Sequence, residues 1–360
     1  MEAVRVKLGL RSYYIYIGAG VLGNLGRRMK ELACGKKVML VSNPAVLNVY
    51  GDRVKKSLAG CGFEVVNAEI GAGEGNKTLA TAGKLYDAAF SFEMDRKSPV
   101  VALGGGVVGD VAGFVAATYM RGVPFIQVPT TLLAQVDSSV GGKVAVNHPG
   151  GKNIIGAFYQ PRLVLIDINT LKTLPPREVR SGVAEVIKYG VIENAKLFAW
   201  LEEHIELLLC GERKALTHVV RESCRIKARV TEKDETEQGL RAILNYGHTV
   251  GHAVEALAGY GQYTHGEAVS IGMAVAARLA AALGLLPGPD RARIEKLLQR
   301  AGLPLELPEE IPAEAVLDKL YHDKKTTGGR LNLVLPELIG KVSVKRDIPA
   351  ELLTKIIRAG

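Results

Sequence analysis

Three histidines that lie close together in the sequence have the types and spacing to bind a metal ion. His248 and His252 stand four residues apart, hence on one face if the segment is a helix, and His265 follows at the start of the next helical segment. A zinc site that does chemistry commonly keeps three protein ligands and leaves one position for water or substrate. A lone histidine more often caps a helix or packs in a core, so the predicted metal site rests on the cluster.

A carboxylate and the cysteine pattern bear on the same site. Glu185 stands among apolar residues of a helical segment, where a charge is costly unless it is paired or metal-bound. The four cysteines are scattered without close pairs, so neither a disulfide framework nor a thiolate zinc site is indicated. Any metal must therefore use nitrogen and oxygen ligands.

A glycine-rich segment is a candidate nucleotide-binding loop. Gly104, Gly106 and Gly109 satisfy G-x-G-x-x-G directly after a predicted strand and before a helix. Glycines there let a diphosphate approach backbone N–H groups at the helix start, although a plain strand-to-helix turn has the same spacing. In the usual dinucleotide-binding order this motif follows the first strand, whereas here it follows the third or fourth.

Other loops offer groups for an anion. The loop 71–77 could place Glu74 on a ribose hydroxyl and Lys77 on a phosphate, or it could be a solvated turn. Glycine precedes lysine at Lys143 and at Lys152, which lets a cation reach a ligand held by backbone groups. Taken singly, each of these cationic residues is typical of a solvated surface position. As a set near glycine-rich or polar turns, they predict a phosphate site and allow a carboxylate: Arg121, Lys143, Lys152, Asn153, Lys188, Lys227, Arg241 and Lys324.

The elements that must position these residues fall into two parts. The first part alternates short β-rich runs with helical stretches, which predicts a doubly wound, Rossmann-like parallel sheet. We expect parallel strands at 37–43, 63–70, 98–103, 123–129 and 162–168, helices at 45–59 and 77–92, and an antiparallel pair at the sheet edge, 4–8 with 13–18.

After Pro175-Pro176 the pattern becomes mainly helical. We expect helices at 177–210, 213–232, 244–259, 266–284 and 289–301, and a strand at 330–336. The prediction is therefore an NAD-binding α/β domain over 1–174 and an α-helical metal- and substrate-binding domain over 175–360.

Composition narrows the class of partner. Among 360 residues, 46 basic and 37 acidic side chains give a net charge of +9, which suits a nucleic acid, an anionic lipid or an anionic metabolite. Basic residues form no long run and only 6% of residues are aromatic, so an anionic metabolite fits better. The N-terminal segment lacks the pattern of a signal peptide and no stretch has the length to span a bilayer, so a cytoplasmic enzyme is expected.

Taken together, the motifs resemble those of the 3-dehydroquinate synthase family from about residue 37 to the C-terminus. The stretches that carry the resemblance are GGGVVGDVAGFVAATYMRG (104–122), QVPTTLLAQVDSSVGGKVAVN (127–147), GKNIIGAFYQP (151–161), LPPRE (174–178), AEVIKYG (184–190), LNYGHTVGHAVEA (244–256), HGEAV (265–269) and DKK (323–325). The family implies a homodimer that uses NAD⁺ catalytically and a divalent metal, zinc or cobalt. It converts 3-deoxy-D-arabino-heptulosonate 7-phosphate to 3-dehydroquinate and phosphate in the shikimate pathway, which supplies aromatic amino acids.

The resemblance also implies a role for each matching residue. The metal ligands would be Glu185, His248 and His265, and His252 would be a non-ligand. We expect His252 to move the hydroxyl proton, because an imidazole pKa of about 6.5 suits transfer in both directions. The substrate would meet Arg121, Lys143, Asn153, Lys188, Lys227, Arg241, Asn245, His252 and Lys324, with Arg121 reaching the other subunit. NAD would contact Ala72, Gly73, Glu74, Gly75, Asn76, Lys77, Gly106, Val107, Val108, Gly109, Asp110, Thr130, Thr131, Lys143, Lys152, Thr170, Leu171, Lys172 and Thr173.

One departure and three alternatives remain. The strand ending Val41-Ser42-Asn43 has no acid for the adenosine ribose, which leaves Glu74 as the expected carboxylate. A related sugar-phosphate cyclase that forms another carbocycle, or a metal-dependent polyol dehydrogenase, would share the metal ligands. The dehydrogenase would have no need of the phosphate-binding lysines and would release NADH. A nucleic-acid binder that has lost catalysis is the third alternative, and the intact metal set argues against it.

Overall fold

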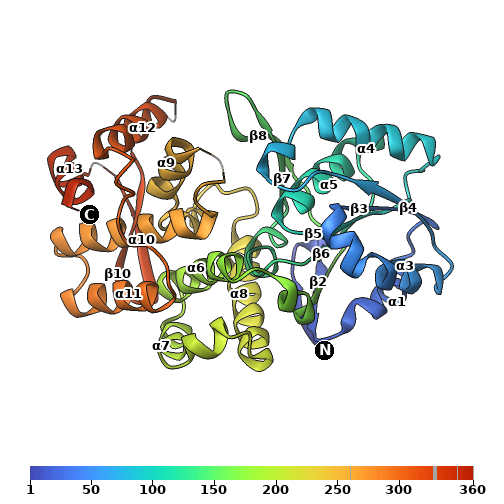
Figure 1. Cartoon of the computed structure of the whole chain (residues 1–360), viewed down its shortest axis with the longest axis horizontal. Helices are drawn as coiled ribbons and strands as arrows, with labels where there is room; N and C mark the ends of the chain where they lie inside the picture. The colour runs from blue at the N-terminus through green and yellow to red at the C-terminus, as the bar shows by residue number, and fades with distance from the viewer. Residues whose placement is uncertain (260, 327–330, 347, 360) are drawn as a thin grey trace. The chain divides into compact units, whose positions relative to one another are not determined.

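The computed structural model describes residues 1–259, 261–326, 331–346 and 348–359, which form two compact units (Figure 1). Unit 1 contains Met1–Leu174 and Leu216–Thr236, and unit 2 contains Pro175–Ala215 and Glu237–Gly360. Most of helix α8 (Arg213–Lys233) therefore belongs to unit 1, which differs from the assignment of all of 175–360 to the second domain. Cys224 of α8 donates to the Gln135 carbonyl at 3.3 Å, and Lys227 pairs with Asp137 at 2.7 Å, so the helix is anchored there.

Unit 1 is built on a seven-stranded sheet in the order β1-β2-β9-β6-β5-β3-β4. The strands are β1 (Glu2–Val6), β2 (Tyr13–Gly18), β3 (Lys37–Ser42), β4 (Glu64–Glu69), β5 (Val100–Gly104), β6 (Phe125–Pro129) and β9 (Leu163–Asp167). β1 and β2 pair antiparallel at one edge and every other neighbouring pair is parallel. The central strands β5, β6 and β9 are buried throughout, as strands covered on both faces must be. The predicted doubly wound parallel sheet is confirmed.

Helices cover both faces of this sheet, and alternate residues of β3 pack against the helices on opposite faces. Val38 and Leu40 pack in one core with helices α1 (Leu25–Lys30) and α3 (Asp52–Ala59). Met39 and Val41 pack in the other core with α4 (Leu79–Ser91) and α5 (Gly106–Thr118). The chain thus leaves β3 toward one side of the sheet and β5 toward the other, so the switch point of the topology lies between them. This explains why the glycine motif follows β5 and not the first strand.

Two parts of unit 1 differ from expectation. β7 (Lys143–His148) and β8 (Gly151–Phe158) pair as an antiparallel hairpin, although no strand was predicted between 129 and 162. Val144 and Val146 alternate inward and join the core beside α5, which accounts for the strand. The helix expected at 45–59 is divided into α2 (Pro44–Val46), a π-helical turn (Leu47–Gly51) and α3.

Unit 2 is mainly helical, as predicted. Its elements are α6 (Pro176–Ile192), α7 (Ala195–Leu209), α9 (His248–Ala258), α10 (His265–Ala282), α11 (Gly288–Arg300), α12 (Ala313–Thr326), β10 (Leu333–Leu338), β11 (Lys341–Lys345) and α13 (Ala350–Ala359). The prediction of one helix over 177–210 is wrong, because the Asn194 side chain accepts from the Leu197 N–H and starts a new helix. The expected helix 244–259 begins only at His248, since Gly247 has a φ of +79°.

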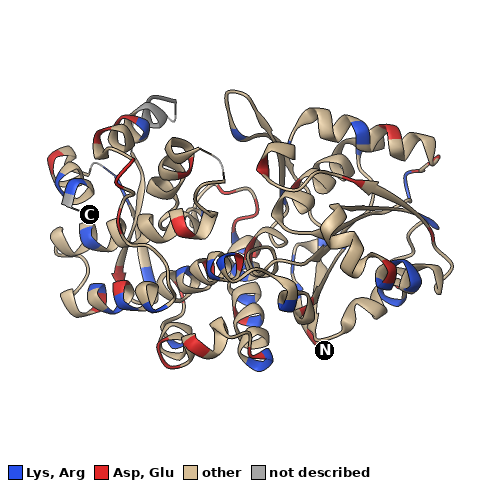
Figure 2. Cartoon of the chain, in the orientation of Figure 1, with Lys and Arg blue, Asp and Glu red and all other residues tan. Residues whose placement is uncertain are grey.

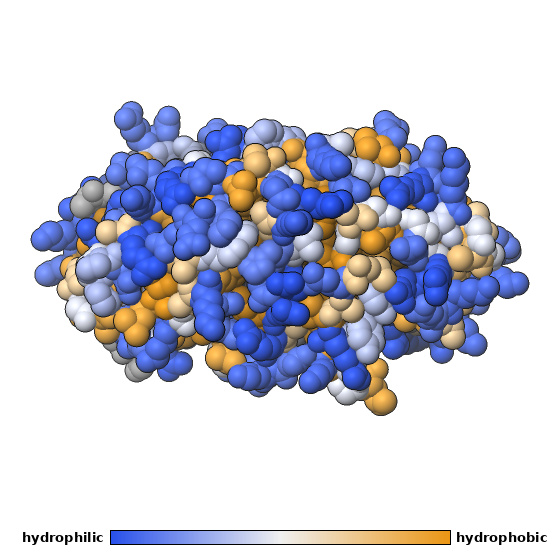
Figure 3. Space-filling view, turned by 90° about the horizontal axis from the view of Figure 1, so that it is seen from below, coloured by the Kyte–Doolittle hydropathy of each residue, from blue (hydrophilic) through white to orange (hydrophobic). Residues whose placement is uncertain are grey.

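Charged residues of both signs are distributed over the elements of each unit (Figure 2). On the face seen in Figure 3, apolar residues lie in several separate patches among hydrophilic ones. Within the described part of the chain, every helix is too short or too polar to cross a membrane. These distributions agree with the absence of a long basic run in the sequence.

Candidate functional site

Three helices of unit 2 bring Glu185, His248 and His265 together. Glu185 lies in the buried middle of α6, and the two histidines are the first residues of α9 and α10. Glycines permit the close crossing of α9 and α10. A Cβ at Gly251 would lie 2.9 Å from the Ala268 carbonyl oxygen, closer than real Cβ atoms come.

The distances within this group fit a tetrahedral cation. The Nε2 atoms of His248 and His265 each lie 3.5 Å from Glu185 Oε1. Ligand atoms placed about 2.1 Å from a tetrahedral zinc ion are roughly 3.4 Å apart. The Glu185 side chain is fully buried, whereas that of His265 is 24% exposed, so one side of the group is open to solvent. The residues present therefore fit a three-ligand metal site with an open position.

The protonation of the two imidazoles follows from their surroundings. Burial, together with the positive charge of Lys188, holds the pKa of His248 well below its usual value, so this ring is neutral and has a lone pair to offer. Burial opposes protonation of His265 as well, but hydrogen bonds to Glu185 and Glu255 outweigh it and raise the pKa to about 9. A cation at this place would have to displace the His265 proton.

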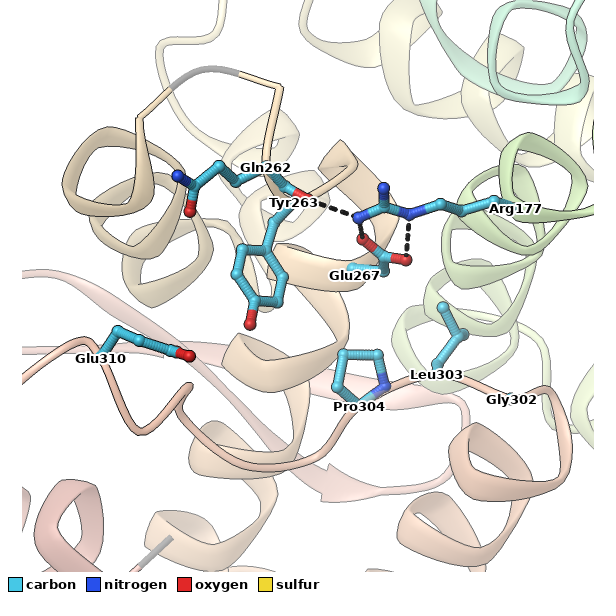
Figure 4. Close-up of a pocket in the computed structure, with 8 residues that line it drawn as sticks. All are labelled: Arg177, Gln262, Tyr263, Glu267, Gly302, Leu303, Pro304 and Glu310. Atoms are coloured by element: carbon cyan, nitrogen blue, oxygen red, sulfur yellow. Dashed lines mark hydrogen bonds and ion pairs between the residues drawn. The ribbon is translucent and has the colours of Figure 1, made fainter.

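Of two basic residues of α6, one contacts the metal group and the other contacts the segment that carries His265. Lys188, which is 1% exposed, forms a buried ion pair with Glu185 three residues earlier. Arg177 makes two bonds to Glu267 in the first turn of α10, at 2.8 and 2.7 Å, and a third to the Gln262 carbonyl (Figure 4). The helix that carries Glu185 is thereby tied to the segment that carries His265. Arg177 and Glu267 also line a polar pocket in unit 2 with Tyr263 and Glu310.

His252 lies beside the metal group on the same face of α9. Its ring centroid is 5.3 Å from that of His248 and 6.0 Å from that of His265, and the residue is exposed. It forms a second group with Glu255 and His265 whose ligand atoms also lie within 4.8 Å of one another. Sequence reasoning gave Glu255 no role, although its place seven residues after His248 puts both on one helix face.

In unit 1 the predicted NAD segments meet at one edge of the sheet. The loop 71–77 follows β4, the glycine turn follows β5, Thr130 and Thr131 follow β6, and the segment 170–173 follows β9. Because these strands are parallel, their carboxyl ends share one edge. Ligands of doubly wound sheets bind at this edge beside the switch point. α5 begins there with its free N–H groups, which suit a diphosphate.

A polar network joins the loop 71–77 to α5 and the β7–β8 hairpin. Lys77, which is 3% exposed, pairs with Asp110 and donates to Asn153. Burial raises the pKa of Asp110 although Lys77 opposes the shift. Asn147 donates to Glu74 at 2.9 Å and accepts from the Asn153 N–H at 2.8 Å. Sequence reasoning did not single out Asn147, because a lone asparagine in a β-rich run has no distinctive spacing.

The remaining predicted substrate residues are divided between the units. In unit 1, the Lys227 ammonium group contacts two oxygens of Asp137, the side-chain Oδ1 at 2.7 Å and the backbone carbonyl at 2.8 Å. Lys143 is exposed on β7. Arg121 follows α5 in a strained turn, with φ of +67°. In unit 2, Arg241 is buried and Asn245 donates to Glu237 at 3.1 Å. The side chain of Lys324 lies outside the described residues.

Comparison with known proteins identifies the family of this chain. A model of the 3-dehydroquinate synthase N-terminal region matches residues 67–181, and a model of the 3-dehydroquinate synthase C-terminal region matches residues 182–326. A 3-dehydroquinate synthase from Pelotomaculum thermopropionicum is 65% identical over 360 residues, which cover 100% of this chain and 97% of that protein.

Solved structures of sugar-phosphate cyclases share the whole fold. A 2-epi-5-epi-valiolone synthase from Streptomyces hygroscopicus subsp. jinggangensis, with NAD⁺ and Zn²⁺ bound, has a TM-score of 0.90 at 29% identity and covers 100% of this chain and 99% of its own. A 2-deoxy-scyllo-inosose synthase complexed with carbaglucose-6-phosphate, NAD⁺ and Co²⁺ has a TM-score of 0.91 at 29% identity and covers 100% of both chains. With two family models matched in sequence order and a relative that is 65% identical over all 360 residues of this chain, the chain belongs to the 3-dehydroquinate synthase family.

Proposed function

We propose that this chain converts 3-deoxy-D-arabino-heptulosonate 7-phosphate to 3-dehydroquinate and phosphate, the reaction that the names of its relatives denote. The steps would be a transient oxidation, loss of phosphate, re-reduction, ring opening and an intramolecular aldol closure, within the shikimate pathway. The observation that carries the proposal is the convergence of Glu185, His248 and His265 in a chain 65% identical to a 3-dehydroquinate synthase.

Glu185, His248 and His265 would hold a divalent metal, zinc or cobalt, which the sugar-phosphate cyclases named above also contain. When bound, the metal supplies a Lewis acid and NAD⁺ supplies a reversible hydride acceptor. Glu185 contributes the negative charge of the site. Lys188 holds that carboxylate in place through their buried ion pair.

The carboxyl edge of the unit 1 sheet would hold NAD⁺. The start of α5 would face the diphosphate with backbone N–H groups. Gly104 and Gly109 allow this turn to pack closely, because an added Cβ would lie 2.6 Å from Val108 Cγ2 and 2.8 Å from Gln127 Oε1, respectively. Glu74, held by Asn147, would accept from the adenosine ribose. The segment 170–173 is fixed by Tyr50, which bonds the Thr170 carbonyl at 3.1 Å and the Thr173 hydroxyl at 2.6 Å.

The basic residues and His252 would serve the substrate itself. Lys143, Asn153, Lys227 and Arg121 of unit 1, and Lys188, Arg241, Asn245 and Lys324 of unit 2, would bind its phosphate, carboxylate and hydroxyl groups and keep the reacting atoms aligned. His252 is exposed beside the two ligand imidazoles and would move the hydroxyl proton. By family, the working form would be a homodimer.

The test is an assay of both products. Purified protein, the heptulosonate phosphate, zinc and catalytic NAD⁺ should release phosphate and form 3-dehydroquinate in equal amounts. Release of phosphate with a different carbocycle would point to another sugar-phosphate cyclase. Absence of both products would contradict the proposal.

A further inference from the structure

A buried carboxylate stands beside the candidate metal site on the side away from Glu185. Glu255 of α9 is 8% exposed, and its Oε2 lies 3.3 Å from Nδ1 of His265. It follows His248 by two helical turns, so one face of α9 presents both residues. A buried carboxylate without a cationic or hydrogen-bonding neighbour is costly, and here the neighbour is a ligand imidazole.

Both candidate ligand imidazoles have an acceptor at Nδ1. For His248 the acceptor is the Tyr246 carbonyl, at 3.1 Å, and for His265 it is Glu255. A neutral imidazole carries its proton on one nitrogen and its lone pair on the other, so an acceptor at Nδ1 directs the lone pair to Nε2. In each ring Nε2 is the atom that lies 3.5 Å from Glu185 Oε1.

We infer that Glu255 is a positioning residue that fixes the tautomer and the ring orientation of His265 for metal binding. Carboxylates commonly hold a metal-bound histidine in this way. α9 would then supply one ligand directly, His248, and orient the second, His265, on the neighbouring helix. This inference rests on the metal site of the proposed function and adds the residue that prepares one of its ligands.

Glu255 could instead be a ligand of a second cation, and this is the alternative that the experiment must distinguish. His252, Glu255 and His265 form a group that could itself hold a cation. If this site and the Glu185 site were both filled, His265 would bind one metal through each ring nitrogen. Orientation of the ring needs only the hydrogen bond between Glu255 and His265, which the structure contains, so it is the interpretation that we test.

The experiment compares zinc binding by the metal-free full chain in four forms. These are wild type, Glu255→Ala, Glu255→Gln and the control Glu295→Gln, which removes a carboxylate whose partners are Arg278 and Arg291 in the same unit. Zinc affinity and stoichiometry come from competition with a chelator, the ligand field from the visible spectrum of the cobalt form, and folding from urea unfolding of each apo protein.

We expect Glu255→Ala to weaken zinc binding by about 10- to 100-fold and to alter the cobalt spectrum. Glu255→Gln, whose amide oxygen still accepts from Nδ1, should lose less, and it carries the test if the alanine variant fails to fold. The control should keep wild-type affinity and spectrum even where its apo protein is less stable.

Wild-type affinity and an unchanged cobalt spectrum in both Glu255 variants would overturn the inference alone. A wild-type chain that binds no zinc would overturn both the inference and the proposed function. Two zinc equivalents that fall to one in Glu255→Ala would replace the positioning role by a second cation site.

Discussion

At the scale of single residues, the site depends on which nitrogen atoms carry protons. His248 is neutral because it is buried beside Lys188, and its Nδ1 is occupied by a backbone carbonyl. His265 is protonated in the metal-free protein because two carboxylates face it. His252, by contrast, is exposed and is not proposed as a metal ligand. These differences assign separate roles to three histidines of one cluster.

Replacing His248 should have a different consequence from replacing His252. We expect His248→Ala to lose zinc binding and turnover together, because a three-ligand site loses one ligand. His252→Ala should keep the metal and lose about 10²- to 10⁴-fold in turnover, the usual contribution of a positioned proton carrier. Metal content by atomic emission and the phosphate-release rate check both. Near-normal turnover in His252→Ala would remove its proposed role.

The affinity for zinc should rise with pH. Because the pKa of His265 is raised to about 9 in the metal-free protein, zinc must displace a proton below that pH. The interaction of protonated His265 with its carboxylates stabilises the apo protein fully below about pH 6.5 and is lost as pH rises through about 9. Chelator competition at several pH values should therefore show an affinity gain of up to about tenfold per pH unit. A pH-independent affinity would contradict this assignment.

At the scale of elements, the site requires that α9 and α10 cross closely enough for their first residues to meet at Glu185. Gly251 is at the crossing, where an added Cβ would meet the Ala268 carbonyl oxygen and the Val269 Cα at 2.9 and 3.1 Å. These are backbone atoms, which cannot move aside as a flexible side chain can. The crossing distance is therefore a condition for the metal site.

Gly251→Ala should lower the free energy of unfolding by about 1–3 kcal/mol through overpacking, and should weaken zinc binding as well. The matched control is Gly83→Ala in α4, where an added Cβ meets nothing within 4 Å. That variant should be as stable as wild type or more stable by up to about 1 kcal/mol. Urea unfolding and zinc titration of both variants check the pair. If both variants had the same free energy of unfolding and the same zinc affinity, the crossing of α9 and α10 would have room for an added Cβ, and the prediction would be wrong.

The elements also show what sequence patterns can and cannot predict. The parallel strands were predictable because β5 is a continuous apolar run and β6 and β9 are apolar except for one residue each, Gln127 and Asp167. The three metal candidates were predictable because their residue types are rare in apolar surroundings. The start of α7 could not be predicted, because a single capping residue, Asn194, begins the new helix within an otherwise continuous helical pattern. Contacts between distant segments, such as Glu255 with His265, depend on helix crossings that no local pattern encodes.

At the scale of the whole molecule, a net charge of +9 is spread over both units beside acidic residues. Many cations are already paired, including Lys77 with Asp110 and Lys227 with Asp137. Such a distribution suits a small anionic substrate better than a polyanion, which needs a continuous basic surface. The two units supply different parts of the proposed chemistry, a nucleotide site in one and a cation site in the other.

The cofactor should be used without being consumed. With NAD⁺ far below the substrate concentration, we expect many turnovers per NAD⁺ and no net rise in absorbance at the NADH wavelength, because the hydride returns to the same molecule. Continuous spectra recorded beside the phosphate assay measure both. NADH that accumulates in step with substrate loss would instead favour a polyol dehydrogenase.

The three-ligand metal site can be tested directly by a crystal structure of the zinc-loaded protein with anomalous data at the zinc edge. We expect one strong peak about 2.0–2.2 Å from a Glu185 carboxylate oxygen and from Nε2 of both His248 and His265. A peak elsewhere, or ligation that omits Glu185 or either of these histidines, would contradict it.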